Sequence, residues 1–210
     1  MEDVLEVYSR PFNEKRPVIC MDEKPFQLLD EYLEPIPMSE HNHREKYDCE
    51  YIRKGSCSIF MFTEPLGGWR EAHALSRRTA VDWAHQVKWL VDEAYPDVEK
   101  IVLVMDNLNT HTTASLYKAF SPEEAFRISQ RLEIHYTPKH GSWLDIAEIE
   151  LSALTIQCLL NVRIPTLDDL NRILDAWSQN RNSTQKGVSW HFTTETARVK
   201  LAHLYPKIKF

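Results

Sequence analysis

The chain has 210 residues, of which 43% are hydrophobic and 27% charged, and this composition is typical of a globular domain with an ordinary apolar core. Its formal net charge of −6 argues against a protein that holds nucleic acid through bulk positive charge. No apolar run approaches the roughly 20 residues of a membrane span, the acidic N-terminus is unlike a secretion signal, and the four cysteines form no CxxC pair. We therefore expect a cytoplasmic protein with no membrane partner.

The charge is unevenly distributed along the chain. Residues 1–50 carry 13 acidic and 6 basic side chains, whereas residues 181–210 carry 6 basic and 1 acidic. A basic C-terminal tail fits contact with phosphate groups, but by itself it is better explained as a solvated chain end.

The first half of the chain predicts mainly strands. After a short N-terminal helix, residues 16–26 (RPVICMDEKPF) indicate a buried strand that has acidic last residues and ends at Pro25. Residues 51–62 (YIRKGSCSIFMF) predict a hairpin that turns near Lys54 and Gly55, and residues 69–75 (WREAHAL) predict a third strand.

The second half alternates helices with strands. Thr79 and Asp82 form a predicted capping box for a helix that ends before Pro96. Further on, the patterns predict a buried strand at 100–106, helices near 112–120 and 122–130, a strand at 131–137, a long helix from about 144 to 160, and a helix from Thr166. This order predicts an α/β fold, with a meander of strands followed by alternating strands and helices.

Two of the predicted buried strands end in an acid, Asp22 after VICM and Asp106 after VLVM. Ligands of open α/β sheets gather at the carboxyl ends of strands, although a single strand-end aspartate more often caps the next turn. The repeated pattern favours a shared site. The helix after KHGSW offers a third acid, because Glu148 and Glu150 lie at opposite edges of its apolar stripe. Periodicity does not choose between them, and a solvated helix face explains either.

If Asp22, Asp106 and one of these glutamates converge, the site needs a cation. Two like charges about 5 Å apart repel by roughly 3 kcal/mol at an effective dielectric of 20, so three carboxylates partly protonate unless they are neutralised. An all-oxygen set suits Mg²⁺ or Mn²⁺ better than zinc. Two such ions, about 3.5–4 Å apart, activate water and stabilise the leaving oxygen at a phosphodiester.

The ordered motifs MDNLNTHT and HYTPKHGSWLDIAEIE resemble the DDE catalytic domain of mariner-related bacterial insertion-sequence transposases. The resemblance matches Asp22 to the acid of the first strand, Asp106 to the Asp-Asn after the fourth, and Glu148 to the acid of the following helix. The intervening gaps of 83 and 41 residues fit the family. It implies a ribonuclease H-like fold with a five-stranded mixed sheet flanked by helices. The three acids are then the catalytic residues and the ligands of two Mg²⁺ ions, for which Mn²⁺ can substitute.

The resemblance also implies a function. The domain would be the metal-dependent endonuclease and strand-transfer part of a cut-and-paste transposase, which cleaves double-stranded DNA at the element's ends and joins 3′-hydroxyls to target DNA, at a TA dinucleotide. Because two ends must be held together, a homodimer is expected. There is no room for a helix-turn-helix reader before Asp22, so residues 1–210 are expected to be a single catalytic domain served by a separate N-terminal DNA-binding half. Asp145 stands where the family usually has Asn, and we expect it to cap the helix as Asn does.

Several residues and functions remain open alternatives. Candidate DNA contacts, each with a structural or solvated role as the simpler explanation, are Lys139, His140, Trp143, Asn107 and His111. Glu23 is expected to point to the opposite face from Asp22 if its strand continues. A catalytically inactive remnant that only binds DNA or other subunits is the main alternative function. A phosphatase with Asp22 as nucleophile is a weaker one.

Overall fold

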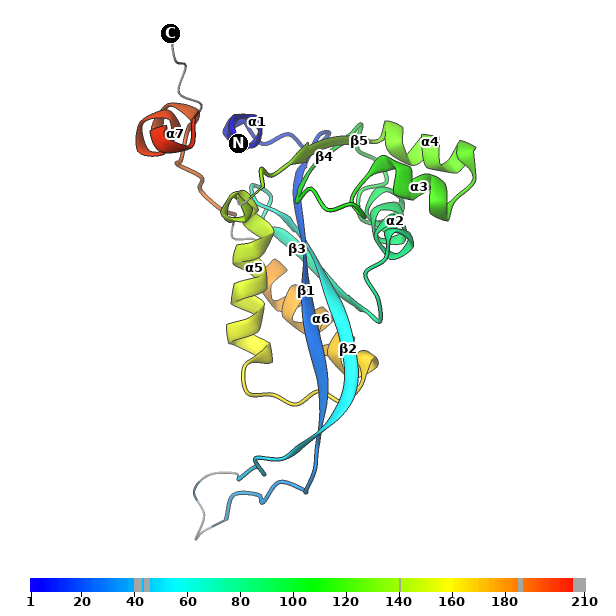
Figure 1. The fold of residues 1–210 in the computed structure, drawn as a ribbon, viewed down its shortest axis with the longest axis vertical. Coiled ribbons are helices and arrows are strands. Elements are labelled where there is room, and N and C mark those ends of the chain that lie inside the picture. The colour runs from blue at the N-terminus through cyan, green and yellow to red at the C-terminus, as the bar shows by residue number, and fades with distance from the viewer. Residues whose placement is uncertain (40–42, 44–45, 140, 185–186, 206–210) are drawn as a thin grey trace.

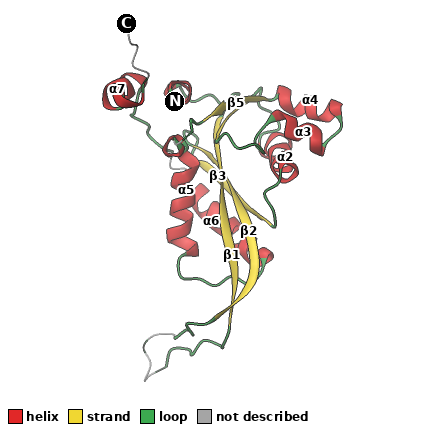
Figure 2. Cartoon of the chain, viewed as in Figure 1, coloured by secondary structure: helices red, strands yellow, loops and turns green. Residues whose placement is uncertain are grey.

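The computed structural model describes residues 1–39, 43, 46–139, 141–184 and 187–205. Its central feature is a five-stranded sheet with helices on both faces (Figures 1 and 2). The strand order is β3-β2-β1-β4-β5, in which β2 is antiparallel to both β1 and β3, and β4 is parallel to both β1 and β5. This is the five-stranded mixed sheet that the family resemblance implied. Within the described part of the chain, no helix is both long enough and apolar enough to span a membrane.

The elements follow one another closely along the chain. In order they are α1 (Glu2–Ser9), β1 (Val18–Glu31), β2 (Tyr51–Glu64), β3 (Trp69–Leu75), α2 (Ala80–Trp89), the π-helical segment η1 (Leu90–Ala94), β4 (Ile101–Met105), α3 (Thr113–Ala119), α4 (Pro122–Gln130), β5 (Leu132–Tyr136), the 3₁₀ turn η2 (Ser142–Leu144), α5 (Ile146–Leu154), the π-helical segment η3 (Thr155–Leu159), α6 (Leu167–Asn182), α7 (Thr194–Lys200) and the 3₁₀ turn η4 (Ala202–Leu204).

The sheet has an apolar layer on each face because alternate residues of a strand point to opposite sides. On β1, Cys20 packs with residues of α1, α5 and α6, whereas Ile19 and Met21 pack with residues of α2, α3 and α4. Figure 1 shows part of this division, with α5 on one side of β1 and β2 and α2 to α4 on the other. Every residue of β4 is buried, as expected for a central strand.

Two strand predictions were wrong. β1 does not end at Pro25 but continues to Glu31. Its parallel pairing with β4 stops at Met21, so one side of β1 lies open at Pro25, and such edge positions tolerate proline. Residues 51–62 lie in one strand, not in a hairpin. The Lys-Gly signal marks a β-bulge, where the pairing with β1 shifts register and Gly55 adopts φ +117°, a conformation that glycine takes readily.

Helix starts were predicted more accurately than strand ends. The capping box of Thr79 and Asp82 opens α2, Ser121 caps α4, and Thr166 caps α6. The helix predicted from about 144 to 160 is divided into the 3₁₀ turn η2, the helix α5 and the π-helical segment η3. The irregular ends follow from hydrogen-bond spacing, which hydrophobic periodicity does not report.

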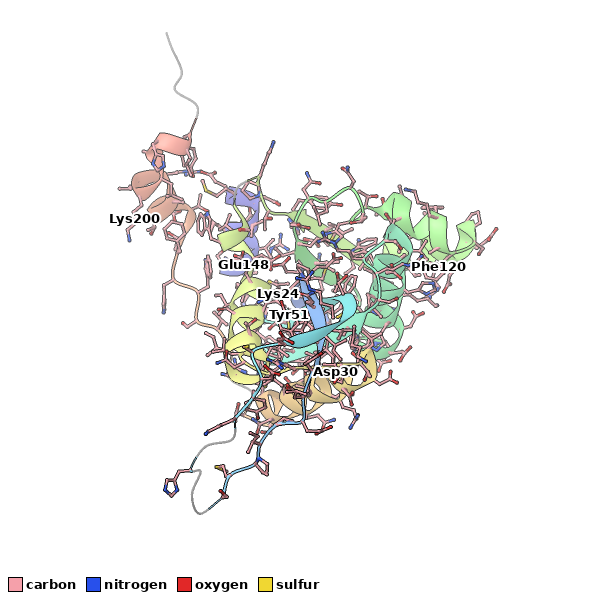
Figure 3. The ribbon with its side chains drawn as sticks, turned by 60° about the horizontal axis from the view of Figure 1, so that its bottom comes forward. Lys24, Asp30, Tyr51, Phe120, Glu148 and Lys200 are labelled. Carbon is pink, nitrogen blue, oxygen red and sulfur yellow. The ribbon has the colours of Figure 1, made fainter. Side chains whose placement is uncertain are left out.

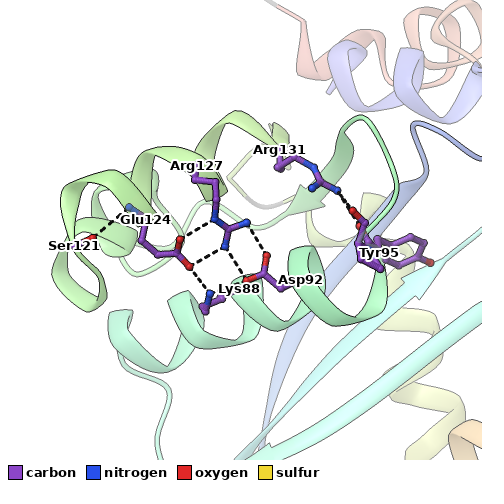
Figure 4. A network of polar contacts seen from close by, with 8 residues as sticks. Lys88, Asp92, Tyr95, Ser121, Glu124, Arg127 and Arg131 are labelled. Atoms are coloured by element: carbon purple, nitrogen blue, oxygen red, sulfur yellow. Dashed lines mark hydrogen bonds and ion pairs between the residues drawn. The ribbon is translucent and has the colours of Figure 1, made fainter.

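A polar network joins α2 and η1 to α4 (Figure 4). Arg127 donates to both oxygens of Asp92, each at 2.8 Å, and to Glu124 at 2.7 and 2.8 Å. Lys88 donates to Asp92 at 2.7 Å and also to Glu124. Because all four side chains are partly exposed, each pair contributes only about 0.2–1 kcal/mol. The network's main effect is to fix how the helices lie against each other.

Helix α6 covers the edge strand β3 with two asparagines. Asn182 accepts a hydrogen bond from the N–H of Arg70 at 2.9 Å and donates to its carbonyl at 2.8 Å. Asn171 does the same with Ala74, at 2.7 and 3.1 Å. Each amide takes the place of a neighbouring strand, which blocks edge-to-edge association.

Candidate active site

Parallel pairing of β1 with β4 sets Asp22 beside Asp106. The last paired residues are Met21 and Met105, and the next residue on each chain segment is an aspartate. Neighbouring strands lie about 4.8 Å apart, so the two acids leave the same edge of the β1-β4 pair. The prediction that Asp22 ends its own strand was wrong: it lies inside β1, at the point where β4 stops. The space beside Asp22 is open because β4 ends there, not because β1 does.

The first turn of α5 brings Glu148 to the same face of the sheet. Asp22 shares its face of β1 with Cys20, against which Ile146 and Ala147 are buried. Glu148 follows Ala147 and is exposed; Figure 3 labels it on this helix. Burial raises the pKa of Asp22 to about 6, and the nearby negative charges of Asp106 and Glu148 add to this rise. The three acids therefore act on one another electrostatically.

The structure separates the two glutamates between which periodicity could not choose. Glu150 is buried, and both of its carboxylate oxygens contact Arg181, at 3.0 and 3.1 Å. The guanidinium of Arg70 lies 3.4 Å away on β3. This ion-pair cluster connects α5 to β3 and α6, and it gives Glu150 a structural role. Glu148 is left as the acid of α5 that faces solvent beside the aspartates.

Asp145 caps α5, as predicted. Its Oδ1 accepts a hydrogen bond from the N–H of Ala147 at 2.9 Å. The side chain is almost completely buried, and its Oδ2 has no hydrogen-bond partner among the described residues. Burial, reinforced by the charge of Asp22, raises the pKa of Asp145 well above its usual range. A fourth carboxyl group therefore lies close behind the three acids.

His111 lies buried on the other side of Asp106. Its Nδ1 is 2.5 Å from Oδ1 of Asp106, its Nε2 is 2.9 Å from Oε1 of Glu23, and its ring stacks on Trp83 at 5.9 Å. The prediction of a DNA contact does not fit this side chain, which is 0% exposed. Glu23 does point away from the Asp22 face, but into the protein instead of into solvent. Burial opposes protonation of His111, yet the hydrogen bonds and charges of Asp106 and Glu23 outweigh it and raise its pKa to about 9.

Three of the remaining candidate DNA contacts have exposed side chains. Lys139, Trp143 and Asn107 are exposed, and the ring of Trp143 lies edge-on to Phe192 at 5.7 Å. They are therefore accessible to a large ligand. His140 lies outside the described residues.

Lys24 is a candidate that the sequence reasoning missed. It lies two residues beyond Asp22 on the same face of β1, and its Nζ donates to Oγ1 of Thr155 in η3 at 2.5 Å (labelled in Figure 3). The two-residue period of a strand would have found it, but the expected strand end at Pro25 hid the pattern. Lys24 is the cation nearest in sequence to the proposed acids.

The donor set suits a hard divalent cation, although the carboxylates do not surround one point. No three His, Cys, Asp or Glu side chains among the described residues form a ready metal site. Asp22 accepts the N–H of Glu23 at 2.7 Å, and Asp106 is turned towards His111. Metal binding would thus require the three carboxylates to come closer together. Burial is the main cause of the raised pKa of Asp22, and the repulsion from Asp106 and Glu148 adds to it; this repulsion and the all-oxygen donors fit Mg²⁺ or Mn²⁺.

Comparisons with solved structures find the same fold. A Mos1 mariner paired end complex with Mn matches with a TM-score of 0.55 and 15% identity, over 84% of this chain and 52% of the Mos1 chain. The Mos1 strand transfer complex gives 0.55 and 14%, over 84% and 51%. The mariner Mos1 paired end complex with Mg gives 0.52 and 14%, over 88% and 55%. The chain therefore spans about half the length of these relatives, and at such identities the likeness shows the fold.

The comparisons confirm the ribonuclease H-like α/β fold and the resemblance to mariner-related transposases. No curated protein sequence matches the chain. A family model described as DDE superfamily endonuclease matches residues 17–171, a range that includes Asp22, Asp106 and Glu148. Since this match covers well over half of the 210 residues, the chain belongs to the DDE superfamily endonuclease family.

Proposed function

We propose that this chain is the metal-dependent endonuclease and strand-transfer domain of a cut-and-paste transposase, with Asp22, Asp106 and Glu148 as its metal ligands and catalytic residues. The observation that carries the proposal is the pairing of Met21 with Met105, because it sets the two aspartates side by side on neighbouring strands. The position of Glu148 on the same face supports it. So does the family match, since the match spans all three acids.

Two Mg²⁺ ions, or Mn²⁺ in their place, would activate the attacking oxygen and stabilise the leaving oxygen. The Mos1 complexes with Mn and with Mg support the use of a divalent ion. Asp22 would offer its oxygens from within β1 and Asp106 from the residue directly after β4, while the exposed Glu148 would approach from α5. A water oxygen first bonds to phosphorus while the bond to the 3′ oxygen breaks. The freed 3′-hydroxyl then attacks a target phosphorus, and the target's own bond from phosphorus to its 3′ oxygen breaks, so that this oxygen leaves as a new 3′-hydroxyl. One site thus serves both displacements.

The proposed partners are two DNA ends and a second copy of this chain. The Mos1 structures are paired end and strand transfer complexes, which supports binding of transposon ends in pairs. A separate N-terminal half would read the ends, and a TA dinucleotide would be the target. Exposed Lys139, Trp143 and Asn107, together with Lys24, are the proposed DNA contacts.

The test compares metal binding and DNA cleavage in matched variants. Asp22→Asn, Asp106→Asn and Glu148→Gln should each weaken Mn²⁺ binding measured by calorimetry and abolish metal-dependent nicking of a DNA duplex. Glu123→Gln is the control, because Glu123 is also an exposed acid in the first turn of a helix, on α4. It should change neither measurement. Thermal unfolding of each variant checks that the fold is retained.

Other results would point to the alternatives. DNA binding by the native chain without metal-dependent nicking would indicate an inactive remnant. Turnover of a small phosphate ester, with a trapped phosphoryl group on Asp22, would indicate a phosphatase.

A further inference from the structure

We propose that Glu23 and His111 form a positioning pair that holds Oδ1 of Asp106 and leaves Oδ2 as the oxygen offered to a cation. The inference rests on the proposed role of Asp106 as a metal ligand. It concerns two residues that the proposed reaction itself does not use.

The contacts place one imidazole between two carboxylates. Nδ1 of His111 lies 2.5 Å from Oδ1 of Asp106, and Nε2 lies 2.9 Å from Oε1 of Glu23. Glu23 belongs to β1 and Asp106 directly follows β4, so the ring connects the two strands that carry the proposed aspartate ligands. A displacement of either carboxylate therefore affects the position of the other through this ring.

The surroundings hold the ring in place. His111 is 0% exposed and the side chain of Glu23 is 3% exposed. Trp83 stacks on the ring with an angle of 25° between the planes. The backbone of His111 is also fixed, because its N–H donates to the carbonyl of Leu108 at 3.0 Å and its carbonyl accepts from the hydroxyl of Tyr136 at 2.8 Å. The ring has little freedom to turn away from Asp106.

Hydrogen-bond counting shows what the ring supplies. A neutral imidazole has one N–H and can donate to only one carboxylate, whereas the doubly protonated ring donates to both. Both neighbours are acceptors when ionised: Nε2 is hydrogen-bonded to Glu23, whereas Nδ1 contacts Oδ1 of Asp106 as an ion pair without hydrogen-bond geometry.

The exposure of Asp106 indicates which oxygen remains available. Its Oδ1 is inaccessible to solvent, yet the side chain as a whole is 34% exposed. The accessible oxygen is therefore Oδ2, on the side away from His111. Hydrogen-bonded groups behind a metal ligand commonly change metal affinity by about 10–100-fold, because they fix the ligand's orientation.

Two near-isosteric variants separate positioning from packing. In His111→Asn the amide nitrogen takes roughly the place of Nδ1 and can still donate to Asp106, whereas in His111→Gln it takes roughly the place of Nε2. We expect His111→Asn to bind Mn²⁺ within about 3-fold of the native chain and His111→Gln to bind about 10–100-fold more weakly. Adding Glu23→Gln to His111→Gln should produce no further loss, because the two residues act through one ring. Equal Mn²⁺ affinity of His111→Gln and the native chain would overturn the proposal.

A metal-free measurement separates this proposal from the proposed function. Proton NMR of the native chain should show two downfield imidazole N–H signals from His111. Asp106→Asn should shift or remove the Nδ1–H signal, and Glu23→Gln the Nε2–H signal. If the native chain binds no Mn²⁺, the proposed function fails, and these signals still decide whether His111 holds Asp106. Their absence, or their indifference to Asp106→Asn, overturns the positioning pair.

Discussion

At the scale of single residues, Asp145 carries a carboxyl group whose effect on stability depends on pH. Its side chain is 2% exposed, and burial raises its pKa well above the value of about 3.9 in an unfolded chain. The folded state therefore holds this proton to a higher pH than the unfolded state does. The resulting stability is complete below about pH 4 and is lost as pH rises towards the folded-state pKa.

Asp145→Asn should therefore stabilise the protein at high pH. Asn is as good a helix cap as Asp, and it removes the buried acid. We expect the free energy of unfolding to rise by on the order of 2 kcal/mol at pH 8 and to change little at pH 4. Urea unfolding at the two pH values measures both. Asp168→Asn, at an exposed acid in the first turn of α6, is the control and should show no such dependence on pH. The same gain at pH 4 and pH 8 would contradict the argument.

The sequence predicted the residues that their immediate neighbours in the chain mark, and it missed those whose surroundings come from distant segments. Asp22 and Asp106 end apolar runs, so their neighbours in sequence mark them. The burial of His111 and the pairing of Glu150 with Arg181 depend on partners far along the chain. Periodicity reports which face of an element a residue occupies, but not what packs on that face. That limit explains why Glu148 was assigned only by the resemblance.

At the scale of elements, the bulge in β2 shows how one glycine can be misread. A turn and a β-bulge both use residues with positive φ, so the Lys-Gly pair predicted a hairpin where a strand continues. Both wrong strand predictions, at Pro25 and at Gly55, lie in the part of β1 and β2 beyond the end of β4. In that part, the long antiparallel pairing of β1 with β2 continues past Pro25 and Gly55, residue types that often end a strand.

Gly55→Ala should destabilise the protein through backbone strain alone. Gly55 has φ +117°, and a Cβ added there would meet no atom within 4 Å, so crowding makes no contribution. We expect a loss of about 1–3 kcal/mol in the free energy of unfolding. Urea unfolding measures it. Ser56→Ala, at the neighbouring exposed position of β2, is the control and should change stability by less than about 0.5 kcal/mol. A Gly55→Ala variant as stable as the native chain would show that the strand relaxes.

The edge strand β5 is tied to the segment between α1 and β1 by a carboxylate that titrates in acid. Glu133 accepts a hydrogen bond from Arg10 at 2.7 Å and also pairs with Arg16. The bond from Arg10 is the main reason that the pKa of Glu133 is lowered to about 2. Because the unfolded value is about 4.3, this stability is present above that pH and is lost as pH falls towards 2.

Glu133→Gln should therefore make the free energy of unfolding less dependent on pH in the acid range. The variant is expected to lose on the order of 1 kcal/mol at pH 6, since the group is partly screened by solvent, and less than that at pH 3. Unfolding free energies of both chains at the two pH values test this. Glu123→Gln, at an exposed acid on α4, should leave the difference between pH 6 and pH 3 unchanged. An equal loss of unfolding free energy in Glu133→Gln at pH 6 and at pH 3 would show that titration of Glu133 does not contribute to the loss of stability in acid.

At the scale of the whole molecule, α1 and α7 meet on the α5 face of the sheet, so that segments near the two ends of the chain lie together. Figure 1 shows α7 beside α1. Arg198 donates to both carboxylate oxygens of Glu2, each at 2.8 Å, and Trp190 packs against Tyr8 with ring centres 4.9 Å apart. Tyr8 in turn donates to the carbonyl of Leu144, just before α5. The basic tail, explained from the sequence as a solvated end, is instead partly packed.

Trp190→Ala should loosen α1 before it loosens the sheet. Removing a half-buried indole should cost about 2–3 kcal/mol, and the loss falls first on the contact between the chain ends. Hydrogen exchange should then accelerate at the amides of α1, such as that of Leu5, more than at those of the central strand β4. Trp89→Ala is the matched control, because Trp89 is a half-buried indole that packs on Phe62 and Trp69 with the opposite apolar layer. It should accelerate exchange in α2 and leave α1 protected. Equal acceleration of α1 and β4 in Trp190→Ala would mean that the chain ends unfold only with the whole domain.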